Sequence, residues 1–179
     1  WLANGTGNNL NKVIYDNKTK KFDLEKFDIR SGNQEITFFG KMDNKALSKD
    51  LAFEFANVQL DNITPDIDSL NLKGVVNGSI NYHELKEQIS PTANIEIKDF
   101  NINNSHQGDL KIAIKGKNSV EKYAVESSLI RDGDISFSAI GDLDFTPNKP
   151  TLDVIIDFEK FKLDAFSPLG EDVLTNIRG

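Results

Sequence analysis

The sequence of 179 residues contains no cysteine and only two histidines. Without cysteine it offers no disulfide framework, no thiolate metal ligands and no cysteine nucleophile. No apolar run approaches the roughly 20 residues that a membrane-spanning helix needs, and no basic-then-apolar leader is present. Basic residues number 21 against 28 acidic ones, which gives a formal net charge of -7, and they are scattered singly. Nucleic acid is therefore not an expected partner.

Residue patterns that carry catalysis or metal binding are also missing. His83 and His106 lie in polar connections, where solvated loop side chains are the expected interpretation. No serine sits in a Gly-x-Ser-x-Gly nucleophile elbow. Asp132-Gly-Asp134 lacks the further oxygen ligands and terminal glutamate of a helix-loop-helix calcium site, and Asp-Gly between strands is typical of a hairpin turn. We expect no enzyme activity, no metal and no cofactor.

Four segments share an eight-residue pattern with apolar residues at positions 1, 3, 6 and 8. They are Phe22 to Ile29, Phe53 to Leu60, Ile95 to Ile102 and Ile156 to Leu163. Positions 1 and 3 have the period of a β-strand, as do 6 and 8, but the two halves are offset by one residue. A β-bulge in the middle keeps all four apolar side chains on one face. The sequence thus predicts four strands, each bent at the same place, in one curved sheet.

The pattern divides the candidate site residues into two sets. The first set, before each predicted bulge, is expected to line an apolar groove: Phe22, Leu24, Phe53, Phe55, Ile95, Ile97, Ile156 and Phe158. The second set follows each bulge on the same face: Phe27, Ile29, Val58, Leu60, Phe100, Ile102, Phe161 and Leu163.

Period-two alternation covers most of the remaining chain, and turn residues separate the alternating runs. No segment keeps apolar residues at i, i+3, i+4 and i+7 over three turns, so little helix is expected. We predict an all-β fold of about eleven antiparallel strands in meander order. With no amphipathic helix to cover it, the apolar face must either meet a second sheet in a filled sandwich or curve into an open trough. The repeated bulges favour the trough.

The length suits one domain. Residues 1–10 have little pattern and are left unassigned, and residues 11–179 are predicted to form a single β-repeat module. Sliding the chain on itself by about 101 to 105 residues aligns 28–74 with 129–179, matching Gly32 with Gly133 and Gly40 with Gly141. A repeated strand unit is typical of arrays in which each unit buries its neighbour's flank. Because the chain starts at Trp1 and stops within a strand pattern, we expect a segment of a longer protein.

Three features together resemble a known family. They are the recurring bulge, the related motifs Asp61-Asn-Ile-Thr-Pro65 and Asp164-Ala-Phe-Ser-Pro168, and the predicted strand Leu72-Lys-Gly-Val-Val-Asn-Gly-Ser-Ile80. They resemble the TamB family, the translocation and assembly module subunits in the AsmA-like repeat group of Gram-negative envelopes. The Asn-rich and Lys-rich composition is most similar to the Bacteroidetes branch of that family. The resemblance runs from Phe22 onward. The family's N-terminal membrane anchor is not within this sequence.

The resemblance implies a non-enzymatic role in the periplasm. Members are thought to form long β-grooves that bridge inner and outer membrane, conduct phospholipid, and assist outer-membrane protein assembly and secretion. It implies a phospholipid or other acyl-chain ligand and a parent anchored in the inner membrane. It also implies an outer-membrane assembly barrel of the TamA or BamA kind, reached through other parts of the parent. Unpaired edges of an excised array would also permit an edge-to-edge homodimer. The alternative is a filled β-sandwich spacer or adhesin-type module without ligand.

Overall fold

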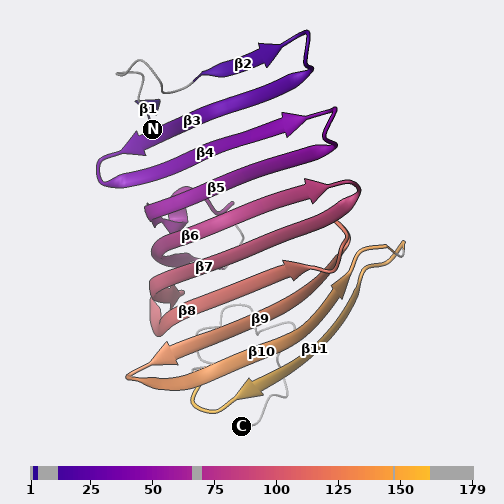
Figure 1. The fold of residues 1–179 in the computed structure, drawn as a ribbon. Coiled ribbons are helices and arrows are strands. Elements are labelled where there is room, and N and C mark those ends of the chain that lie inside the picture. Colours follow the sequence, from indigo (N-terminus) through magenta and orange to yellow (C-terminus); the bar gives the residue numbers. More distant parts are fainter. Residues whose placement is uncertain (1, 4–11, 66–69, 147, 162–179) are drawn as a thin grey trace.

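The computed structural model describes residues 2–3, 12–65, 70–146 and 148–161. Its strands follow one another down the molecule, with the N-terminal strands at one end and β11 at the other (Figure 1). The elements are β1 Leu2–Ala3, β2 Val13–Asp16, β3 Lys21–Ser31, β4 Gln34–Asp43, β5 Ser48–Gln59, the 3-10 turn η1 Leu60–Asn62, β6 Leu72–Leu85, β7 Gln88–Ile102, β8 Ser105–Gly116, β9 Lys122–Arg131, β10 Asp134–Asp144 and β11 Thr151–Phe158.

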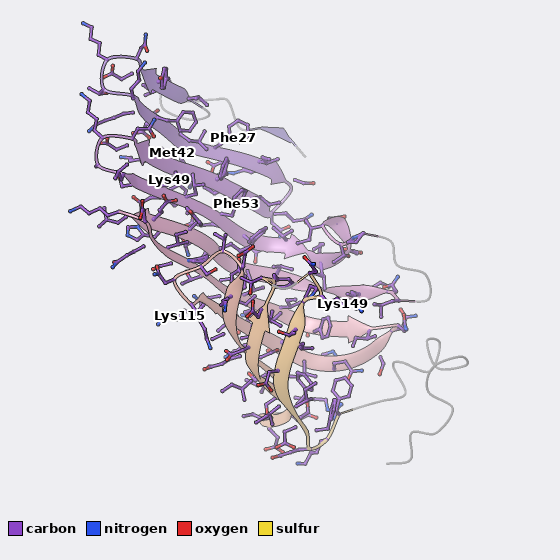
Figure 2. All side chains as sticks on the ribbon, turned by 90° about the vertical axis from the view of Figure 1, so that its right-hand side faces the viewer. Phe27, Met42, Lys49, Phe53, Lys115 and Lys149 are labelled. Atoms are coloured by element: carbon purple, nitrogen blue, oxygen red, sulfur yellow. The ribbon has the colours of Figure 1, made fainter. Side chains whose placement is uncertain are left out.

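The eleven strands of the described residues belong to one antiparallel sheet, in the order β1-β3-β4-β5-β6-β7-β8-β9-β10-β11, with β2 also pairing with β3. The predicted all-β meander of about eleven strands is confirmed. The strands β9 to β11 stand at a steep angle to β3 to β5, as the accumulated twist and coiling of a long sheet require (Figure 2). Because the described strands form one sheet, they do not make the two facing sheets of a sandwich.

The predicted bulges are present. Register shifts lie between Leu24 and Phe27 in β3, between Phe55 and Val58 in β5, and between Ile97 and Phe100 in β7. The fourth predicted bulge lies just after β11. There the N–H groups of Glu159 and Lys160 both donate to the carbonyl oxygen of Ser136, at 3.2 and 3.3 Å. Two consecutive donors on one acceptor indicate the same two-against-one arrangement.

Two tight hairpins that the sequence predicts depend on backbone in the left-handed region. Asn103 and Asn104 join β7 to β8 with φ of 49° and 66°, and Asp132 and Gly133 join β9 to β10 with φ of 55° and 88°. Two positive φ values in a two-residue loop define a type I′ turn, which matches the right-handed twist of the strands and favours Asn, Asp and Gly. The sequence predicted both of these turns.

Several features recur at the predicted spacing of 101 residues. Gly32 and Gly133 both lie in hairpin turns with positive φ. The Nζ of Lys21 lies 2.9 Å from Asp43, and that of Lys122 lies 3.2 Å from Asp144. Gly40 and Gly141 both face a backbone carbonyl of the next strand so closely that a Cβ would collide with it. The longer repeat of 28–74 with 129–179 stays a prediction, because much of its second copy lies outside the described residues.

Candidate functional site

Cross-strand register gives the sheet one apolar face, which three rows of paired residues define. The Phe53 row contains Phe27, Phe38, Phe53, Ile80, Ala93, Ile114, Val125, Gly141 and Val154. The Phe55 row contains Ile29, Ile36, Phe55, Gly78, Ile95, Ile112, Ser127, Ala139 and Ile156. The Val58 row contains Val58, Val76, Ile97, Leu110, Leu129, Phe137 and Phe158. Phe27 and Phe53 mark this face in Figure 2.

All eight predicted groove residues lie on this face. Six of them belong to the three rows, while Phe22 pairs with Met42 and Leu24 pairs with Gly40 further toward the hairpin tips. Their exposure differs widely. Leu24 and Ile97 are buried, whereas Phe53, Ile156 and Phe158 are 40%, 50% and 53% exposed. The bulges therefore bring the predicted side chains to one surface, but the middle and the C-terminal end of that surface remain open to solvent.

The residues after the bulges form the buried end of the face. One contiguous core cluster contains Val58, Leu60, Val76, Ile97, Phe100, Ile102 and Leu129. Leu60 reaches it from η1, and Phe161 packs its ring 5.8 Å from that of Phe137 and 5.5 Å from that of Phe158, centre to centre. Phe27 and Ile29 are half-buried. Leu163 lies outside the described residues.

Polar residues end the face on the hairpin-tip side. Lys49 and Glu84 are cross-strand neighbours in the row of Phe22 and Met42, and the Nζ of Lys49 lies 2.9 and 3.1 Å from the two Glu84 carboxylate oxygens. Tyr82 donates its hydroxyl to Glu84 at 2.6 Å. That bond raises the pKa of Tyr82 to about 12, and the Lys49 ammonium is the main cause of the lowered pKa of Glu84. Sequence reasoning missed this network because its members alternate along strands whose register was unknown.

The opposite face is mostly polar and carries two open hollows. One of about 760 Å³ lies over β3 to β6 and is lined by side chains such as Phe39, Lys41, Asp50 and His83. The other, of about 660 Å³, lies over β6 to β10 beside Asn94, Glu96, Lys111 and Ser128. Among the predicted groove residues only Leu24 and Ile95 border these hollows. The predicted apolar surface is thus a long open face and not either of these pockets.

Chemistry other than apolar contact has little support in the described part of the chain. There, no group of three or more His, Cys, Asp or Glu side chains is placed to hold a metal ion. His83 pairs with Asp50, and both side chains are exposed. No helix among these residues is both long and apolar enough to cross a membrane.

Comparison with protein-family models, with curated proteins and with solved structures finds no match to this chain. The geometry of the apolar face is therefore the main guide to function.

Proposed function

We propose that this chain is a non-enzymatic, acyl-chain-binding segment of a TamB-like or AsmA-like bridge. In this proposal its apolar face conducts phospholipid across the periplasm of a Gram-negative bacterium or assists outer-membrane protein assembly and secretion. The observation that carries the proposal is the Phe53 row, in which no polar side chain occurs from β3 to β11.

The energetics of the open face support a ligand. Phe53 and Ile80 are cross-strand neighbours at the centre of the face and are 40% and 44% exposed. Fully burying a side chain of this size is worth about 1.5 to 3 kcal/mol. Large exposed apolar patches on soluble proteins generally mark a binding surface. A ligand that covers several such side chains is therefore stabilised without any directional bond.

The dimensions suit hydrocarbon chains. The Phe53 row crosses nine strands, and a spacing of about 4.8 Å gives it a length of roughly 38 Å. That exceeds the roughly 30 Å hydrocarbon thickness of a bilayer, of which one acyl chain fills about half. Chains lying across the strands would meet no polar side chain along this row, so nothing holds them at one position. The resemblance to TamB supports the same use, with the parent anchored in the inner membrane and an outer-membrane barrel reached by other parts of it.

The test uses native mass spectrometry after mixing the detergent-free protein with phosphatidylethanolamine and phosphatidylglycerol vesicles. We expect phospholipid adducts on the wild type and their loss in the double variant Phe53→Glu, Ile80→Glu. The matched control is Ile140→Glu, because Ile140 is 55% exposed on the polar face and should keep the adducts. Circular dichroism confirms that each variant is folded. A folded wild type without adducts would contradict the proposal and favour a structural spacer or adhesin-type module.

A further inference from the structure

The last strand, β11, presents apolar side chains on both faces of the sheet. Leu152 and Ile156 lie on the apolar face and are 68% and 50% exposed, while Ile155 lies on the polar face and is 73% exposed. Among the described residues β11 pairs only with β10, so its outer backbone groups have no strand partner. Exposed sheet edges are usually protected by lysine, proline or bulges, whereas Val154, Ile155 and Ile156 form an uninterrupted apolar run. The composition of this edge therefore favours pairing with a further strand.

The opposite edge has complementary features. The four residues of β2 run along one half of β3, with Val13 and Tyr15 on the apolar face and Ile14 on the polar face. These three side chains are 62%, 57% and 47% exposed. Thus β2, like β11, is apolar on both faces at its centre.

Charge distinguishes the two edges. On the polar face of β11, Ile155 lies between Asp153 and Asp157. On the polar face of β2, Ile14 is preceded by Lys12, whose backbone carbonyl accepts a 2.9 Å hydrogen bond from Glu25. One edge therefore carries a carboxylate on either side of its central isoleucine, and the other carries a lysine two residues before its own central isoleucine.

One antiparallel register satisfies both faces. With Ile155 opposite Ile14, Ile156 meets Val13 on the apolar face and Val154 meets Tyr15, because side chains alternate strictly along both strands. On the polar face Asp157 then meets Lys12. Asp153 falls opposite Asp16, the one like-charged pair, at the end of β2 beside Lys21. This register continues all three elements of the pattern: antiparallel order, the apolar face and the polar face.

We propose that β11 of one copy of this chain pairs antiparallel with β2 of a second copy, so that the sheet and its apolar face continue from copy to copy. The interface is heterologous: in a pair of copies, the β2 edge of one and the β11 edge of the other stay free to pair with further copies. Self-pairing of β11 about Ile155 is disfavoured, since it places Asp153 of one copy against Asp157 of the other. This inference does not depend on lipid binding.

The test compares oligomeric states of the wild type and two edge-blocked variants, Ile155→Lys and Ile14→Lys, by sedimentation velocity from roughly 10 μM to 1 mM. A lysine at the centre of an edge strand hinders strand pairing. The wild type should show an average mass that rises with concentration past two copies. Each blocked variant alone should stay monomeric, and an equimolar mixture should form dimers and nothing larger, since it retains one compatible pair of edges. The control Val120→Lys changes a 51% exposed residue outside the strands and should behave as the wild type.

The alternatives give different results. Dimers of Ile14→Lys alone would indicate pairing of β11 with β11, and dimers of Ile155→Lys alone would indicate pairing of β2 with β2; either overturns the proposal. A wild type that stays monomeric throughout also overturns it. If a lysine variant proves unfolded by circular dichroism, Asp157→Lys replaces it: at low salt this variant should assemble more weakly than the wild type, because Lys12 would then face a lysine. Equal assembly would contradict the register.

Discussion

The backbone N–H of Asn57 donates a 2.9 Å hydrogen bond to the side-chain Oδ1 of Asn77, straight across the bulge of β5. The bulge of β7 repeats the arrangement, with the N–H of Asp99 donating to Oδ1 of Asp109 at 3.0 Å. Asn57 and Asp99 have φ of 53° and 50°, so the extra residue of each bulge is left-handed. The opposing side chain thus satisfies a donor that the strand ladder has lost.

Removing that acceptor should destabilise the bulge. We expect Asn77→Leu and Asp109→Leu each to lower the free energy of unfolding by about 1 kcal/mol, the usual net value of one such hydrogen bond. Urea denaturation measures the loss. Asn77→Asp and Asp109→Asn keep an oxygen in place and should cost less than half as much. Equal losses for the leucine and the conservative variants would show that the hydrogen bond is not the cause.

The sequence predicted the bulges well because their signal is local. An apolar pattern with one extra residue identifies the bulged strand without knowledge of its neighbours, and the positions in β3, β5 and β7 follow directly. The partner of each bulge depends on register between strands, which short-range pattern does not contain. The acceptors Asn77 and Asp109 were therefore not predicted. The bulge of β3 faces Phe39, whose side chain cannot accept a hydrogen bond, and this difference from the other two bulges was not predicted either.

The difference between local pattern and long-range register also explains how much of the candidate site could be predicted. Alternation placed Phe53, Ile97 and Phe158 on one face correctly. It could not say that Ile97 is buried while Phe53 and Phe158 remain exposed, because burial depends on η1 and on the core cluster at the bulged end. Local pattern fixes which side of a sheet a residue takes, and long-range packing decides whether that side is covered.

Gly78 is required by the close approach of β7. Its φ is 134°, and a Cβ there would collide with the carbonyl oxygen of Asn94. We expect Gly78→Ala to destabilise the protein by about 2 to 3 kcal/mol, since backbone must shift in the centre of the sheet. The matched variant is Gly32→Ala, where φ is 61° but no atom lies within 4 Å of a Cβ. It should cost only about 1 kcal/mol, the strain of the left-handed conformation. Thermal unfolding of both variants checks the difference, and a smaller loss at Gly78 would contradict the close approach.

Tyr82 should ionise at a higher pH than an ordinary tyrosine. Its hydrogen bond to Glu84 raises its pKa to about 12 from an ordinary value of 10. Because the folded pKa is the higher one, the contribution of this bond to stability is complete below about pH 10 and is lost as pH rises toward 12. Glu84→Gln should move the transition toward 10. Ultraviolet absorbance titration measures it, and subtracting the curve of Tyr82→Phe isolates this tyrosine from the other two. An unchanged curve in Glu84→Gln would contradict the assignment.

The hairpin between β6 and β7 uses residues poorly suited to its geometry. Lys86 and Glu87 have φ of 50° and 69°, the type I′ conformation that elsewhere in this sheet is taken by Asn103-Asn104 and Asp132-Gly133. A residue with a Cβ pays roughly 1 to 2 kcal/mol in the left-handed region, and Asn and Gly are the least affected. We therefore expect the double variant Lys86→Asn, Glu87→Gly to gain about 1 kcal/mol in unfolding free energy, after the added flexibility of glycine in the unfolded chain is subtracted. The reverse exchange, Asp132→Lys with Gly133→Glu, should lose a similar amount. Urea midpoints of the two variants must shift in opposite directions, because both turns have the same backbone and differ only in side chain.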